Sequence, residues 1–124
     1  MDFDAIKSAM ANPNNKLFVL CNPHNPVGRV WTKEELETIG DICYRHHVIV
    51  VSDEIHADFA FQGKHKVFAN LKKEYEEWTI TCTSPSKTFN LAGLQTSNIF
   101  IPNQKLKNAF KKPVSYTHLT LPTT

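Results

Sequence analysis

The chain has 124 residues, of which 41% are hydrophobic and 21% are charged, and its formal net charge is +2. This length allows one modest domain, and the scattered mixture of basic and acidic residues gives no basis for nucleic-acid binding. No apolar run is long enough to span a membrane, and the acidic N-terminus MDFDAIKSAM is unlike a signal peptide.

The first half of the chain predicts helices and strands in alternation. Asp2 or Asp4 is placed to begin a short helix, and the apolar run KLFVLCN (residues 16–22) predicts a buried strand. Thr32 and Glu35 form a capping-box pattern that predicts a helix over residues 33–46. Its apolar positions share one face: Leu36, Ile39, Ile42 and Cys43. VIVVS (residues 48–52) predicts a second buried strand.

The second half continues the pattern after a long polar and aromatic connection over residues 53–70. WTITCT (residues 78–83) and TSNIFI (residues 96–101) predict strands, and QKLKNAFKK (residues 104–112) predicts a helix. Apolar strands flanked by amphipathic helices indicate an α/β domain with a mainly parallel sheet. Within the connection, we interpret Lys64, His65 and Lys66 as a solvated loop.

Three polar residues each follow one of the first three predicted strands. They are Asn25, Asp53 and Lys87. Because ligands of open α/β sheets bind outside the carboxyl ends of the strands, we expect these side chains to face one crevice. A surface lysine, with a pKa near 10.4, is almost wholly protonated at neutral pH. A lysine that acts as a nucleophile or base therefore requires a buried, desolvated setting, which we expect for Lys87.

The motifs NPHNPVGR, SDEIH and SPSKTFNLAGLQ resemble, in this order, the core motifs of fold-type I pyridoxal-phosphate (PLP) enzymes of the class I/II aminotransferase superfamily. The resemblance covers about residues 2–113. It implies that residues 1–113 are part of the large PLP-binding domain, that the cofactor is PLP and that the substrate is an amino acid. It also implies a homodimeric parent protein.

The resemblance assigns a role to each residue of the predicted crevice. Lys87 corresponds to the lysine that forms a Schiff base with the cofactor aldehyde and then removes the substrate α-proton. Asp53 corresponds to the carboxylate beneath the pyridine nitrogen, and Asn25 to the amide that binds the ring oxygen. The alternatives are a solvated loop lysine for Lys87, the cap of a turn for Asp53 and a turn-forming residue for Asn25.

Four further residues stand at less specific positions of the pattern. Ser84 and Ser86 resemble hydroxyl donors to the cofactor phosphate, although Ser86 is equally suited to cap the following turn. His56 stands where aminotransferases commonly have a tyrosine, and it either lies near the cofactor oxygen or is a hydrogen-bonded loop histidine. Gln95 stands where the common pattern has a phosphate-binding arginine, so phosphate binding here has less positive charge.

DEIHADF, GKHKVFAN and SKTFNLAGLQ together look most like the MalY/PatB-type cystathionine β-lyases. This resemblance implies a C–S lyase that releases a thiol, pyruvate and ammonia by β-elimination. The alternatives for the parent protein are an aminotransferase of the same fold and an aminotransferase-like domain of a transcriptional regulator. We expect the 124 residues alone to be inactive. The residues alone do not separate elimination from transamination, because both reactions begin with removal of the same proton.

The cysteines and the C-terminal segment complete the sequence predictions. Cys21, Cys43 and Cys82 lack metal-ligand spacing, which indicates reduced thiols in a cytoplasmic protein and no metal site. We interpret Cys21 and Cys82, which end apolar strands, as small core residues. The uncharged segment VSYTHLTLPTT (residues 114–124) resembles a translated sequencing adapter, and we expect it to be a non-native tail.

Overall fold

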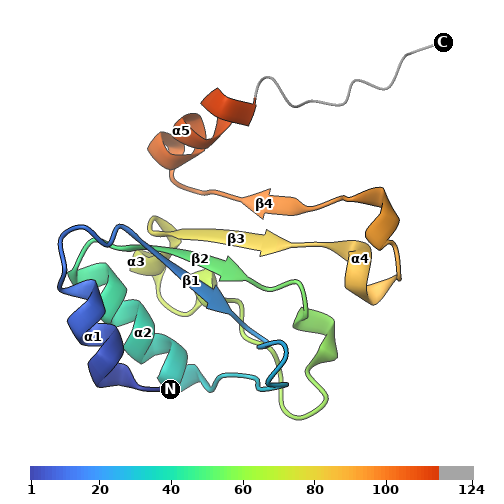
Figure 1. The fold of residues 1–124 in the computed structure, drawn as a ribbon, viewed down its shortest axis with the longest axis horizontal. Coiled ribbons are helices and arrows are strands. Elements are labelled where there is room, and N and C mark those ends of the chain that lie inside the picture. Colours follow the sequence, from blue (N-terminus) through green and yellow to red (C-terminus); the bar gives the residue numbers. More distant parts are fainter. Residues whose placement is uncertain (115–124) are drawn as a thin grey trace.

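The computed structural model describes residues 1–114, which form a four-stranded sheet with helices against it (Figure 1). The strands β1 (Leu17–Cys21), β2 (Ile49–Asp53), β3 (Thr79–Thr83) and β4 (Asn98–Phe100) lie in this order across the sheet. The first three strands are parallel and β4 is antiparallel to β3. The predicted α/β class with a mainly parallel sheet is therefore confirmed. The expected non-native tail lies, except for its first residue, outside the described residues.

The two N-terminal helices begin where their capping residues predict. Asp2 caps α1 (Phe3–Met10) with its carboxylate. At the start of α2 (Lys33–Arg45), the Thr32 hydroxyl accepts a hydrogen bond from the Glu35 backbone N–H at 3.3 Å. The Glu35 carboxylate in turn accepts one from the Thr32 N–H at 2.9 Å. This reciprocal pair is the capping box that the sequence indicates.

The remaining elements are short, apart from the last helix. They are the 3₁₀ turns Ala57–Phe59, Phe68–Asn70 and Ala92–Leu94, and the helices α3 (Lys73–Glu76), α4 (Pro85–Thr88) and α5 (Gln104–Val114). Helix α4 carries Lys87, which the sequence analysis placed in a loop. Within residues 1–114, no helix combines the length and the apolar content that crossing a membrane requires.

One face of the sheet packs against α1 and α2 and forms the core. Strand residues such as Leu20 and Val50, each 2% exposed, meet the apolar face of α2. All four predicted positions on this face are buried: Leu36, Ile39, Ile42 and Cys43. Burying each large aliphatic side chain contributes roughly 1.5–3 kcal/mol relative to leaving it exposed, so this layer is the main source of stability.

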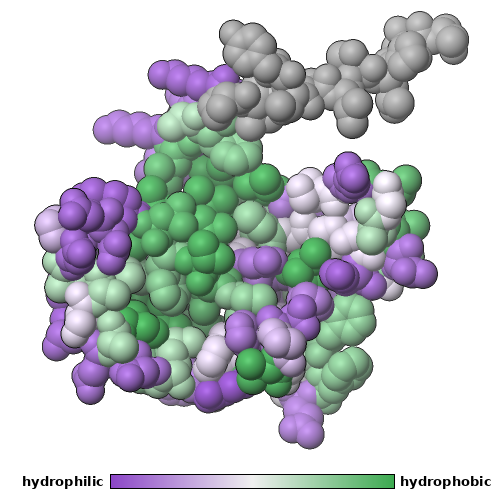
Figure 2. All heavy atoms as spheres, viewed as in Figure 1, coloured by the Kyte–Doolittle hydropathy of each residue, from purple (hydrophilic) through white to green (hydrophobic). Residues whose placement is uncertain are grey.

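The opposite face of the sheet is open among the described residues. The parallel register places Leu17 beside Ile49 and Val19 beside Val51 on this face. Leu17 is 51% and Val19 is 64% exposed, so the prediction that β1 is a buried strand is wrong. The physical reason is that β1 is an edge strand that is covered on one side only. Figure 2 shows a broad apolar area over the strands below α5.

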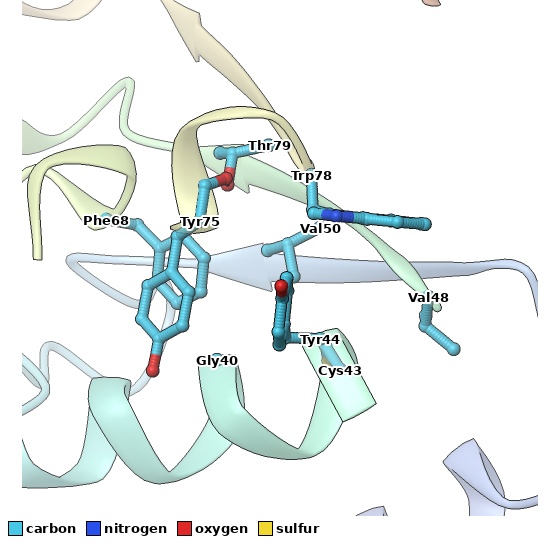
Figure 3. A pocket seen from close by; sticks show the side chains of 9 residues that line it. All are labelled: Gly40, Cys43, Tyr44, Val48, Val50, Phe68, Tyr75, Trp78 and Thr79. Atoms are coloured by element: carbon cyan, nitrogen blue, oxygen red, sulfur yellow. The ribbon is translucent and has the colours of Figure 1, made fainter. Parts of the chain in front are cut away.

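Tyr75 joins α3 to α2 through a contact that requires a glycine. Its ring is buried and stacks on Phe68, with ring centroids 5.5 Å apart. The ring lies directly over Gly40 of α2 (Figure 3), where an added Cβ atom would come within 2.4 Å of it. The Tyr75 hydroxyl lies 2.5 Å from a carboxylate oxygen of Asp41, which also binds the Lys72 amine at 2.6 Å.

We predict that Gly40→Ala destabilises the fold by about 1–3 kcal/mol, because the ring of Tyr75 must move out of a packed site. This loss outweighs the gain of up to about 1 kcal/mol expected from alanine in a helix. Urea unfolding monitored by circular dichroism measures the change. Gly93→Ala is the matched control, because nothing lies within 4 Å of its added Cβ. Equal midpoints for the two variants would contradict this packing.

We predict that Asp41→Asn lowers stability near neutral pH by at most about 1 kcal/mol, since the group is partly exposed. Hydrogen bonds from Lys72 and Tyr75 lower the pKa of Asp41 below its ordinary value of 3.8. The stabilisation is therefore present above pH 3.8 and is lost as the pH falls through the lowered pKa. Unfolding free energies of both proteins should thus converge in acid, whereas Glu74→Gln should follow the unchanged protein throughout.

Candidate active site

The carboxyl ends of the three parallel strands lie side by side at one edge of the sheet. Cys21 is the register partner of Asp53, and Asp53 is the partner of Cys82. Since register partners point to the same side of a sheet, the Asp53 carboxylate lies between the two thiols. Asp53 is the last residue of β2, whereas the sequence predicted that it directly follows the strand. The three strand ends lie side by side, whereas the convergence of Asn25, Asp53 and Lys87 on one crevice stays a prediction.

One oxygen of the Asp53 carboxylate accepts a hydrogen bond within the protein, and the other does not. Oδ1 accepts a hydrogen bond from the backbone N–H of Ile55 at 3.1 Å, which is the turn contact that the alternative interpretation expected. Oδ2 has no hydrogen-bond partner among residues 1–114. A half-buried carboxylate oxygen without a partner is suited to bind an N–H group of a ligand.

Hydrogen bonds within residues 22–31 fix the loop after β1. The buried side chain of Asn22 accepts a hydrogen bond from the Trp31 backbone N–H at 3.0 Å. Further out, the His24 N–H donates to the Arg29 carbonyl at 2.8 Å and closes the turn. Asn25 lies at the exposed tip of this loop. The loop thus presents the Asn25 amide to solvent beside the edge of the sheet.

Asn25 and His56 line one cavity of about 170 Å³, together with the aromatic rings of Phe59 and Phe61. The Nδ1 atom of His56 is buried and has no hydrogen-bond partner in the described part of the chain. The described residues thus supply no hydrogen bond to this nitrogen, and whether His56 lies near a cofactor stays a prediction. The structure brings these two predicted residues together around one cavity.

Lys87 is exposed, so the expectation of a buried lysine is wrong for this chain. The reason is that α4 lies beyond the end of β3, where no other described element covers the open face. The neighbouring Thr88 hydroxyl donates a hydrogen bond of 2.6 Å to the Asp58 carboxylate. This bond joins the helical turn of Lys87 to the turn that follows His56, and it links the two sides of the crevice.

The two serines bind each other and their own turn. Ser84 caps α4 by accepting a hydrogen bond from the Ser86 N–H at 3.1 Å, so the cap is Ser84 and not Ser86. Its Oγ also lies 2.6 Å from the Thr96 carbonyl and 2.8 Å from the Ser86 Oγ. One hydroxyl has one proton, which the Thr96 carbonyl receives. Ser84 must therefore turn away from this carbonyl before it donates to a phosphate.

The sequence analysis missed a buried pair beneath this site. His65, assigned there to a solvated loop, has a side chain only 11% exposed, and its Nε2 lies 2.7 Å from Glu54 Oε2. Lys64 and Lys66 are exposed as expected. The signal was available in the alternation of the strand. Residues 52 and 54 point to the core face when Asp53 points to the open face, so Glu54 required a buried partner.

The thiols differ in their environment. Burial raises the pKa of the Cys43 thiol to about 12. Burial also raises the pKa of Cys82, and the nearby Asp53 and Glu54 carboxylates add to this shift. Cys21 and Cys82 are half-buried on the open face, so they are not the core residues that we expected. No group of potential metal ligands was found among the described residues.

These observations define an α/β protein that presents an acid, an amide and an amine around the carboxyl edge of a mainly parallel sheet. Open α/β sheets bind small ligands at this edge. The profile of aminotransferase class I and II matches residues 1–122, and the chain belongs to this family. The family resemblance on which the sequence analysis relied is thereby confirmed.

Three relatives carry the comparison further. Cystathionine beta-lyase PatB of Bacillus subtilis is 49% identical over 110 residues, which are 88% of this chain and 28% of PatB. Cystalysin from Treponema denticola, which contains pyridoxal 5′-phosphate, matches with a TM-score of 0.92 and 41% identity over 99% of this chain and 32% of its own. The PLP-bound C-S lyase from Staphylococcus hominis matches with a TM-score of 0.84 and 41% identity. The match covers 93% of this chain and 29% of the lyase. The chain thus spans about a third or less of each relative.

We predict that iodoacetamide alkylates Cys82 more slowly at neutral pH than an ordinary exposed cysteine, because its raised pKa lowers the fraction of reactive thiolate. Asp53→Asn removes one of the neighbouring charges and should shift the reaction to lower pH. Peptide mass spectrometry of the native apoprotein measures the modified fraction. Cys43 serves as the internal control and should stay unmodified while the fold is intact. An unchanged pH profile in Asp53→Asn would contradict the placement of the two groups.

Proposed function

We propose that this chain forms part of the active site of a PLP-dependent C–S lyase. The reaction is β-elimination from cystathionine or a cysteine-type substrate, which releases a thiol, pyruvate and ammonia. The observation that carries the proposal is the free Oδ2 of Asp53 at the edge of the sheet, within the SDEIH motif. The C–S lyase names of the relatives support the reaction class.

The residues at the edge fit the polar groups of PLP. The free oxygen of Asp53 suits the protonated ring nitrogen, because a carboxylate prefers a cationic N–H partner. Asn25 and His56, which share a cavity, suit the ring oxygen. Lys87 supplies the primary amine that reacts with the aldehyde. When bound, PLP supplies a conjugated ring that accepts the electrons of the broken bond.

Each residue then has a distinct part in the elimination. Asp53 holds the proton on the ring nitrogen and so keeps the ring electron-withdrawing. Asn25 and His56 orient the ring through its oxygen. With the cofactor and an amino acid bound, the Nζ atom of Lys87 would remove the α-proton as general base. The Cβ–S bond then breaks, and the sulfur leaves with the bonding electrons and takes up the proton held by Lys87 to become a thiol. Water hydrolyses the remaining aminoacrylate to pyruvate and ammonia.

The exposed Lys87 requires a cover for this chemistry, because a solvated amine is protonated at neutral pH. Parallel sheets normally have both faces covered. We therefore propose that further parts of a protein as long as the relatives, and a second subunit of a homodimer, cover the open face. The phosphate is held by Ser84 and Ser86, with Gln95 as a neutral donor in place of the common arginine.

We place the parent protein in the cytoplasm and propose that residues 114–124 are not native to it. The reduced state of the three cysteines supports the compartment. Sequencing the source DNA across the junction of Pro113 and Val114 tests the second point. A reading frame that continues into sequence typical of the family supports a non-native tail, and a stop codon directly after the segment contradicts it.

We predict that Lys87→Ala in the full-length protein lowers pyruvate release from cystathionine by at least about 100-fold, since it removes the general base. Borohydride reduction of the unchanged holoenzyme should fix the cofactor to the peptide that contains Lys87, as detected by mass spectrometry. Lys105→Ala is the matched control, because this lysine is also exposed and lies on α5.

Two outcomes would contradict the proposal. Cofactor fixed to another lysine would remove Lys87 from the reaction. Amino-group transfer to a keto acid, without release of pyruvate and ammonia from cystathionine, would show an aminotransferase that uses the same residues.

A further inference from the structure

Glu54 is a buried carboxylate with a complete set of donors. Only 3% of the residue is exposed. Its Oε1 accepts hydrogen bonds from the Ser52 hydroxyl at 2.8 Å and from the Phe68 backbone N–H at 3.1 Å. Its Oε2 lies 2.7 Å from His65 Nε2. A buried carboxylate is costly unless it is hydrogen-bonded, and these three contacts meet that requirement.

The donors come from both ends of one loop. Ser52 precedes residues 55–67, while His65 and Phe68 stand at the far end of this segment. Glu54 therefore ties the beginning of the loop to its end. We call residues 55–67 the clamp loop. Ordering such a loop costs conformational entropy, and contacts at its base confine the conformations of all residues between them.

The clamp loop reaches both sides of the proposed PLP site. His56 and Phe59 line the cavity that also contains Asn25. Between them, the Asp58 carboxylate accepts the hydrogen bond of 2.6 Å from the Thr88 hydroxyl. Thr88 is the residue after Lys87 and ends α4. The loop is thus in contact with the group proposed for the ring oxygen and with the turn of the reactive lysine.

Helix α4 needs such a support. It comprises four residues, and an isolated helix of this length is unstable in water. Its N-terminus is capped by Ser84, whereas its last residue, Thr88, is held by Asp58. The side chain of Lys87 is exposed and makes no hydrogen bond in the described structure. The direction in which the amine leaves the backbone is therefore set by the turn and its two anchors.

We propose that the clamp loop is a positioning element for Lys87. The contact between Glu54 and His65 joins the two ends of the loop, and the hydrogen bond between Asp58 and Thr88 connects the loop to the turn that carries Lys87. These residues do not react, but they fix the lysine where it meets the cofactor. This inference rests on the proposed function, because it requires PLP to be bound at Lys87. It adds a second layer to the site in residues outside the cofactor-binding set.

The test uses the full-length protein loaded with PLP and five variants. Thr88→Val removes the hydroxyl but keeps the shape of the side chain, and Thr88→Ser restores the hydroxyl. Asp58→Asn weakens the same contact from the other side. Glu54→Gln disturbs the base of the loop. Lys64→Gln is the control, because this exposed residue lies in the loop and makes no contact with Glu54 or Thr88.

We expect Thr88→Val and Asp58→Asn to lower kcat by about 10- to 100-fold with little change in KM, as for a displaced catalytic group. The visible absorption of the bound cofactor should change its pH dependence in both variants, and Thr88→Ser should restore it. Hydrogen exchange measured by mass spectrometry should become faster at residues 84–88 in both variants. In Glu54→Gln it should become faster at both residues 55–67 and residues 84–88. Lys64→Gln should leave all three properties unchanged.

Unchanged kcat and cofactor absorption in Thr88→Val would overturn the proposal, even if Glu54→Gln fails to fold. Faster exchange confined to residues 55–67 in a folded Glu54→Gln variant would also overturn it, because the loop would then not support the lysine turn. Failure of the proposed function is distinguishable. In that case borohydride would not fix cofactor to Lys87 in the unchanged protein, whereas failure of the present inference leaves this attachment intact.

Discussion

The strict alternation of side chains at the end of β2 is the constraint on which the site depends. Asp53 points to the open face, between the two neighbouring strand ends, while Ser52 and Glu54 point to the core. A shift of one residue in register would exchange these positions and bury the wrong carboxylate. Of these two adjacent acids, Asp53 is thus proposed to bind a ligand, while Glu54 is a buried structural anchor.

One-sided packing separates the stabilising core from the proposed site. The core lies between α2 and one face of the sheet, where Tyr75 over Gly40 and the capping box at Thr32 fix the helices. The residues proposed for the site lie on the other side of the sheet or at its edge, and this side also has exposed apolar side chains such as Val19. Stability thus comes from the covered face, and the chemistry is assigned to the open face.

The elements with strong local signals could be predicted from the sequence. The box at Thr32 and the apolar spacing of α2 gave its start and its buried face, and the ends of the strands met as parallel topology requires. The burial of β1 could not be predicted, because an apolar run does not reveal whether a strand has neighbours on both faces. The pair of Glu54 and His65 was missed because its partners lie far apart in sequence and the histidine stands between lysines.

The most direct test of the account is a crystal structure of the full-length protein with PLP bound. The account predicts that Asp53 Oδ2 lies within hydrogen-bond distance of the pyridine nitrogen and that Lys87 Nζ is joined to the cofactor. The Asp58–Thr88 hydrogen bond should be present beside this lysine. A cofactor ring bound away from the end of β2, or joined to a different lysine, would contradict the central claim.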